Sequence, residues 1–293
     1  MLTESLIENT VIDLIRLSVT ELPLDVHKCL EEAYKNEKHS IGKIQLKNML
    51  DNLKLAKELR RPLCQDTGLI NFYFKVGSNF SYLGKIEASI RRAVEKATFN
   101  VPLRPNAVDP ITNDNTGNNI GRYVPFLNWE ITSGDHLEIT VVPKGGGSEN
   151  ACRLGMLLPQ DGVEGLKRFV IKTVTDAGGT PCPPTIIGIG VGGGADVAMK
   201  LAKVALLRPL KELNTNKTLA AIEKEIYASV NASGIGPMGL GGNNTTLAVK
   251  IEYAHRHPAS YPVAIAFQCW AARRASAKIG ADGSVEYLTH IYR

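Results

Sequence analysis

The spacing of apolar residues predicts helices in the first third of the chain. Apolar side chains recur every three or four positions along residues 4–20, as on one face of a helix. A second helix is predicted with Asp25 as its cap, and a third helix from its cap Ser40 to Arg60. Pro62 ends the third helix, because proline disfavours helical geometry in the residue before it.

The later pattern alternates between strands and helices. Strands are predicted at residues 69–76, 137–143, 185–191, 246–253 and 262–267. Helices are predicted at residues 83–97, 161–177, 196–207 and 217–230. We therefore expect a mixed α/β fold, in which a helix-rich N-terminal part is followed by mixed sheets with flanking helices. A soft boundary near residue 130 divides it into subdomains 1–130 and 131–293, which can also form one domain.

Composition and charge narrow the class of protein. The 293 residues are 44% apolar and 22% charged, which suits a globular chain with a sizeable core. The net charge of +5 is small and scattered, which argues against nucleic acid as a partner. Neither a signal peptide nor a long apolar span is evident, so we expect a soluble cytoplasmic protein. The odd number of dispersed cysteines favours a reducing compartment. They are Cys29, Cys64, Cys152, Cys182 and Cys269.

Three of the cysteines share a loop context at the end of a predicted element. Cys64 precedes a turn sequence, Cys182 lies among prolines, and Cys269 follows a strand. Loops at element ends can present a ligand from a rigid scaffold. No CxxC pair occurs, so spacing alone leaves each of them as an isolated buried thiol. Cys29 is predicted to lie in the core, and Cys152 is interpreted as a bystander thiol.

Glycine-rich segments are a second feature. The run from Gly188 to Gly193 matches GxGxxG between a strand and a helix. A dinucleotide site is one interpretation, and close packing of the strand on the helix is the simpler one. A third is that backbone N–H groups near Asp196 hold an anion. The loops 145–150 and 234–244 allow the same interpretation, because glycine lets backbone donors approach a carboxylate closely.

Charged residues near these loops are candidates for chemistry. Arg104 lies in the long Asn- and Pro-rich loop 100–122 and can hold a carboxylate in a bidentate fork. Asp66 can serve as an acid or base, and His257 can donate to a substrate oxygen. Taken singly, each such residue is more often a solvated or structurally paired side chain. GxSxG, HExxH and Walker motifs are absent, which argues against the usual hydrolases and NTPases.

Several short motifs follow one another along essentially the whole chain. They are RPLCQDTG (61–68), LRPNA (103–107), GGGSEN (145–150), CPP (182–184), GIGPMG (234–239), HP (257–258) and CWAARR (269–274). In this order the motifs resemble those of the α subunit of two-subunit class I fumarate hydratases, the iron–sulfur type, to which tartrate dehydratase α subunits are related.

The resemblance implies a cofactor and a set of site residues. It implies a [4Fe–4S] cluster held by Cys64, Cys182 and Cys269, with one iron left open as a Lewis acid. Asp66 is implied as the catalytic residue beside that iron. The implied substrate ligands are Gln65, Arg104, Gly146 and His257.

The resemblance also implies a partner and a reaction. Family members need a second part that supplies a threonine base and further carboxylate ligands, so a β subunit is expected in a heterodimer or heterotetramer, with the active site at the interface. The implied reaction is the reversible hydration of fumarate to malate, a step of the tricarboxylic acid cycle. Gly-Ser-Glu-Asn (147–150) and Gly-Gly-Ala-Asp (193–196) favour fumarate over tartrate. A Gly-rich nucleotide-binding or redox-sensing module is the alternative from another class.

Overall fold

The computed structural model describes residues 1–291, whose contacts form two compact units. Unit 1 comprises residues 1–24, 52–146 and 273–291, and unit 2 comprises residues 25–51 and 147–272. This grouping differs from the predicted division near residue 130, because the last strands of the chain complete the sheet of unit 1. The final two residues of the predicted second subdomain lie outside the described part.

Unit 1 contains a five-stranded sheet in the order β2-β1-β3-β8-β9. The strands are β1 (Leu69–Gly77), β2 (Phe126–Thr132), β3 (Leu137–Lys144), β8 (Ala275–Ile279) and β9 (Val285–Tyr287). β1 and β2 are parallel, and the other pairs are antiparallel. Leu69 at the start of β1 lies opposite Lys144 at the end of β3. The segment before β1 and the segment after β3 therefore lie next to each other at the same end of these two strands.

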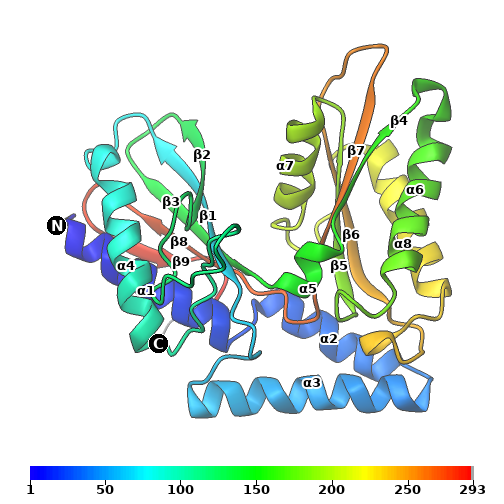
Figure 1. Cartoon of the computed structure of the whole chain (residues 1–293), viewed down its shortest axis with the longest axis horizontal. Helices are drawn as coiled ribbons and strands as arrows, with labels where there is room; N and C mark the ends of the chain where they lie inside the picture. The colour runs from blue at the N-terminus through cyan, green and yellow to red at the C-terminus, as the bar shows by residue number, and fades with distance from the viewer. Residues whose placement is uncertain (292–293) are drawn as a thin grey trace. The chain divides into compact units, whose positions relative to one another are not determined.

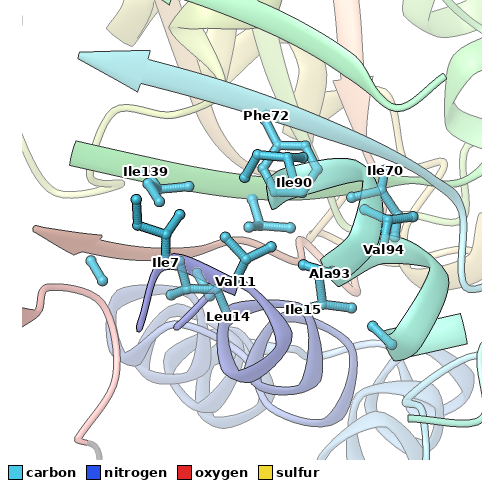
Figure 2. Packing of buried hydrophobic residues seen from close by; sticks show 14 of the residues in the cluster. Ile7, Val11, Leu14, Ile15, Ile70, Phe72, Ile90, Ala93, Val94 and Ile139 are labelled. Atoms are coloured by element: carbon cyan, nitrogen blue, oxygen red, sulfur yellow. The ribbon is translucent and has the colours of Figure 1, made fainter. Parts of the chain in front are cut away.

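Two helices, α1 (Glu4–Thr20) and α4 (Ile86–Asn100), pack against this sheet, and the 3-10 turn η1 (Leu83–Lys85) precedes α4. Figure 2 shows Ile7, Val11 and Leu14 of α1 directed towards the sheet residues Phe72 and Ile139. All five side chains are fully buried, and burying each contributes about 1.5–3 kcal/mol relative to leaving it exposed. This core holds β1 in place, and the Cys64 segment directly precedes β1.

Unit 2 contains a four-stranded sheet in the order β4-β7-β5-β6. The strands are β4 (Arg153–Leu157), β5 (Thr185–Val191), β6 (Thr246–Tyr253) and β7 (Tyr261–Gln268). β5 is parallel to β6 and antiparallel to β7. Figure 1 shows α7 (Ala195–Ala205) on one face of the sheet, with α6 (Gly162–Ala177) and α8 (Lys217–Ala232) on the other.

Five further helical elements complete the two units. They are α2 (Leu24–Asn36), α3 (Ser40–Leu59), α5 (Gly146–Asn150), η2 (Pro159–Asp161) and η3 (Pro237–Gly239). Within residues 1–291, no helix is both long enough and apolar enough to cross a bilayer.

The glycines of β5 allow α7 to lie directly on the strand. A Cβ atom at Gly190 would collide with the carbonyl oxygen of Ala198, and one at Gly188 with that of Ala202. Both oxygens belong to the backbone of α7, so they cannot rotate out of the way. The interpretation of the GxGxxG run as close packing of strand on helix is confirmed.

The predicted elements agree with the structure except at a few positions. The mixed α/β class is confirmed, and the predicted spans 4–20 and 185–191 coincide with α1 and β5. The capping role of Asp25 is wrong, because Asp25 lies inside the first turn of α2 and its Oδ2 accepts from Leu210 N at 3.0 Å. The turn predicted at 145–147 is mostly helical, because Gly146 and Gly147 are the first residues of the short helix α5. Four strands were not predicted: β2, β4, β8 and β9.

Candidate active site

The Cys64 segment forms a tight turn between α3 and β1. The Cys64 thiol is partly exposed and belongs to no disulfide. Two residues on, Asp66 Oδ1 accepts from Gly68 N at 2.9 Å, and Asp66 Oδ2 accepts from Gly146 N at 2.8 Å. Gly68 adopts φ +79°, where a Cβ would also press on the backbone of Lys144. The Asp66 carboxylate therefore ties this turn to the glycine segment after β3.

Arg273, in the segment before β8, supports the same turn. Its side chain is fully buried, and its Nη1 donates to the backbone carbonyl of Asp66 at 2.7 Å. Gly145 lies against both residues, since a Cβ there would be 2.9 Å from Asp66 Oδ2 and 3.3 Å from Arg273 Nη2. The motif residues Asp66, Gly145 and Arg273, far apart in sequence, thus form one tightly packed cluster.

The loop that carries Arg104 is anchored to this turn through its backbone. Arg104 N donates to Thr67 Oγ1 at 3.0 Å, and Arg104 O accepts from Asn119 Nδ2 at 3.0 Å. Asn106 Nδ2 donates to Gly68 O at 3.2 Å. The Arg104 side chain is exposed, and its guanidinium forms no ion pair with any residue that the structure describes. The binding of a carboxylate by Arg104 stays a prediction.

Unit 2 brings Cys182 and Cys269 to the same end of its sheet. Cys182 precedes β5 and Cys269 follows β7. These strands pair antiparallel with Ile186 opposite Gln268, so the two cysteine segments leave the sheet side by side. Trp270 N donates to Cys182 O at 3.0 Å, which joins the segments directly.

The backbone around Cys182 has a special conformation. Cys182 adopts φ +54°, and the following Pro183–Pro184 peptide bond is cis. The loop after α8 supports this segment, because Met238 N donates to Pro183 O at 2.8 Å. Gly239 packs against Gly179, where a side chain would collide with the backbone.

Glu37 directly follows α2, and it binds the loop after α8 at Asn243 and Asn244. This carboxylate is buried and accepts from the N–H groups of Lys38, His39 and Asn243 and from Asn244 Nδ2, at 2.8–3.1 Å. Burial alone raises the pKa of Glu37, but hydrogen bonds from Asn244 and from the backbone outweigh it and hold the pKa below its ordinary value. Sequence analysis missed Glu37, since one glutamate after a helix gives no local sign of a distant loop.

His257 lies in a turn between β6 and β7 of unit 2. Its Nδ1 accepts from Ala259 N at 3.1 Å, so a neutral ring carries its proton on Nε2. The side chain is exposed. His257 is therefore held as a hydrogen-bond donor through Nε2, which suits the predicted contact with a substrate oxygen.

The two other predicted substrate ligands are the side chain of Gln65 and the backbone of Gly146. Gln65 has an exposed side chain beside Asp66. The N–H of Gly146 donates to Asp66. Glu149 of the same motif pairs with Lys203 of α7 at 2.6 Å. The substrate roles of Gln65 and Gly146 stay predictions.

The remaining cysteines have the properties of structural thiols. Burial, helped by the nearby Glu32 carboxylate, raises the pKa of Cys29. A raised pKa keeps the thiol protonated, whereas a metal ligand must be a thiolate. Cys152 Sγ donates to Ser148 O at 3.4 Å. Cys29, predicted in the core, is only partly buried on α2.

No group of three or more His, Cys, Asp or Glu side chains among residues 1–291 is spaced to hold a single metal ion. The ligands of an iron–sulfur cubane bind different iron atoms, so they stand further apart than the ligands of one ion. Thiolates are the ligands that such clusters require, and the chain offers three at turns or strand ends. Three thiols are the kind of ligand that such a cluster takes, and the binding of a cluster by them stays a prediction.

The chain is similar to known proteins over nearly its whole length. A family model described as fumarate hydratase (fumerase) matches residues 8–278. A putative L(+)-tartrate dehydratase subunit alpha of Methanocaldococcus jannaschii is 49% identical over 283 residues, which is 95% of this chain and 99% of that protein. The L(+)-tartrate dehydratase subunit alpha of Escherichia coli K12 is 40% identical over 272 residues, or 92% of this chain and 90% of the relative.

Proposed function

Because this chain belongs to the fumarate hydratase family, we propose that it is the α subunit of a hydro-lyase that interconverts fumarate and malate. The observation that carries the proposal is the pairing of β5 with β7, which brings Cys182 and Cys269 to one end of a sheet. Two thiols presented in this way, with a third in the Asp66 turn, are a donor set suited to an iron–sulfur cofactor.

The proposed ligands of a [4Fe–4S] cluster are Cys64, Cys182 and Cys269. With three thiolates bound, the cluster supplies an open iron that acts as a Lewis acid towards the hydroxyl of the substrate. Cys29 and Cys152 take no part in this proposal.

The substrate is proposed to be a small dicarboxylate held by donors of this chain. The Arg104 guanidinium offers two parallel N–H groups to one carboxylate, and its backbone is already anchored at Thr67. His257 offers its Nε2 proton to a substrate oxygen. The side-chain amide of Gln65 and the backbone at Gly146 complete the proposed set.

Asp66 is proposed to act as the acid that gives a proton to the departing hydroxyl group of malate, so that this group leaves as water. Its two oxygens each accept one backbone N–H, and a carboxylate has about four lone-pair sites in all. Each oxygen thus keeps capacity for a further proton or hydrogen bond. The two backbone donors fix the orientation of the carboxylate, which favours proton transfer along one direction.

Dehydration also requires a base that removes a proton from a carbon atom of the substrate. We propose that a β subunit supplies this base. Both relatives described above are named alpha subunits, which supports a partner. The partner is proposed to carry the threonine base and further carboxylate ligands, in a heterodimer or heterotetramer that works in a reducing compartment. Losing a positioned base typically costs about 10²–10⁴-fold in rate, so this chain alone should show little activity.

Dehydration of L(+)-tartrate is the second candidate reaction. The names of the relatives at 49% and 40% identity favour it. Tartrate differs from malate by one hydroxyl group, and the same carboxylate ligands and open iron suit both substrates.

The test is to reconstitute the chain anaerobically with its β partner and to measure kcat/KM for L-malate and L(+)-tartrate. We expect the higher value with L-malate, and at least about a hundredfold loss when the β partner is omitted. A higher kcat/KM with L(+)-tartrate would show that tartrate is the substrate and that the chain is still a hydro-lyase subunit. Absence of dehydration of either substrate by the iron-loaded complex would contradict the hydro-lyase proposal.

A further inference from the structure

A buried arginine lies beside the turn that carries Cys64, and the proposed function leaves it without a role. Arg273 is the largest fully buried side chain of the described residues, with 2% of its surface exposed. Arginine is almost never fully buried unless its charge is paired. Within residues 1–291, the Arg273 guanidinium forms no ion pair, and its Nε has no hydrogen-bond partner. The Asp66 carboxylate packs against Gly145 as the guanidinium does, but no direct ion pair among the described residues joins the two groups.

The contacts of Arg273 show where this charge acts. Nη1 donates to the backbone carbonyl of Asp66 at 2.7 Å, two residues after Cys64. The Asp66 carboxylate does not take part in this bond, because its oxygens accept from Gly68 N and Gly146 N. Arg273 and the carboxylate thus hold the same turn from two sides, one through the carbonyl and the other through the side chain.

Close packing leaves the guanidinium little freedom to move away from the turn. A Cβ on Gly145 would be 3.3 Å from Arg273 Nη2 and 2.9 Å from Asp66 Oδ2. Only glycine therefore fits between the two groups without displacing one of them. The Arg273 side chain is therefore packed against the turn itself, through Asp66 O and Gly145.

We propose that Arg273 is a positioning residue, which fixes the turn 64–68 and supplies the positive charge that balances an anion bound at Cys64. The proposal rests on the proposed function, in which that anion is the cluster with its thiolates. A buried cation beside an anionic group offsets part of the cost of removing both from water. Arg273 acts through the turn and touches no reacting atom.

The first test measures the turn in the cluster-free chain, by amide hydrogen exchange. Arg273→Gln removes the charged donor, and Arg92→Gln is the control, because Arg92 pairs with Glu4 and Glu8 elsewhere in unit 1. We expect the amides of Gly68 and Gly146 to exchange about tenfold faster or more in Arg273→Gln, relative to the amides of β3. Equal acceleration throughout unit 1, as in a merely destabilised protein, would overturn the proposal.

The second test measures iron and sulfide after anaerobic reconstitution of the full chain. Arg273→Lys keeps the charge and loses the planar fork, so it should retain more cluster than Arg273→Gln. Equal retention by the two variants would overturn the role of the charge. If Arg273→Gln fails to fold, Arg273→Lys is compared with wild type by the same exchange ratio. Failure of the wild-type chain to bind iron would instead contradict the proposed function, whereas the exchange test needs no cluster.

Discussion

The two regions that present the proposed cluster ligands are built in different ways. The Cys64 turn of unit 1 is held by side chains, because Asp66 and Arg273 bind it across long stretches of sequence. In unit 2, Cys182 and Cys269 are held by the main chain, since they flank paired strands and are joined by the bond from Trp270 N to Cys182 O.

This difference determines what a substitution should do in each region. Where strands set the position of a thiol, damage to the packing of the sheet should lower the stability of the unit and the ligand geometry together. Where side chains set it, single substitutions should loosen the turn and leave most of the unit folded. For substitutions that act on these supports rather than on a ligand itself, stability and cluster binding should therefore separate in unit 1 and change together in unit 2.

The largest effect on stability is expected from Gly190→Ala in β5. The added Cβ meets the carbonyl of Ala198 in α7, and overpacking of this kind costs about 1–3 kcal/mol or more in the free energy of unfolding. Gly84→Ala is the matched control, because a Cβ at Gly84 meets nothing within 4 Å. Urea unfolding of the cluster-free chain measures both variants. Equal midpoints would contradict the close packing of α7 on β5.

A somewhat smaller effect is expected from Glu37→Gln, and it should depend on pH. The hydrogen bonds that hold the pKa of Glu37 below its ordinary value of 4.5 stabilise the fold above that pH. This contribution is lost as the pH falls through the lowered pKa. At neutral pH the variant should lose about 2 kcal/mol of unfolding free energy, the typical cost of disrupting hydrogen bonds to a buried charged group.

Unfolding measured at about pH 7 and about pH 4 checks the sign of the Glu37 effect. The difference between wild type and Glu37→Gln should shrink at the lower pH. A constant difference would show that the charge of Glu37 contributes nothing to the anchoring of the loop at Asn243 and Asn244.

Asp66→Asn should lower the stability of unit 1 by about 1–2 kcal/mol, because an amide group cannot accept both backbone N–H groups as a carboxylate does. The amides of Gly68 and Gly146 should lose protection from hydrogen exchange first. If those two amides kept wild-type protection, the carboxylate would not be what holds the turn.

Arg104→Lys should have the smallest effect on stability, within about 0.5 kcal/mol, since the side chain is exposed. Activity of the reconstituted enzyme should nevertheless fall strongly, because lysine keeps the charge but lacks the planar fork. Steady-state kinetics and the melting temperature are measured together. A variant that is unstable but kinetically normal would assign Arg104 to the support of its loop.

The sequence allowed the local elements to be predicted better than the contacts that shape the site. The helix at α1 and the strand at β5 have long, clear apolar patterns and agree with the structure. The strands β2, β4, β8 and β9 were missed. β2 and β4 are edge strands with exposed apolar residues such as Trp129 and Met156, and β8 and β9 are only 5 and 3 residues long. The burial pattern of β2 and β4 is set by neighbouring strands rather than by local alternation.

The supports of the site could not be predicted from local pattern at all. Arg273 and Asp66 are 207 positions apart, and Glu37 and Asn243 are 206 apart. Only the folded sheets bring such residues together. The motif carrying Arg273 was recognised, yet nothing in it indicated a buried charge, because adjacent arginines usually mark a solvated surface.

The most direct test of the account is the iron and sulfide content of Cys182→Ser after anaerobic reconstitution, with Cys152→Ser as the matched control. Cys152 Sγ donates to a backbone carbonyl, as a serine hydroxyl can, so the control should bind as much cluster as wild type. Cys182→Ser should lose most of its cluster while the paired strands β5 and β7 stay folded. Full cluster content in Cys182→Ser, or an equal loss in both variants, would contradict the proposed ligand set.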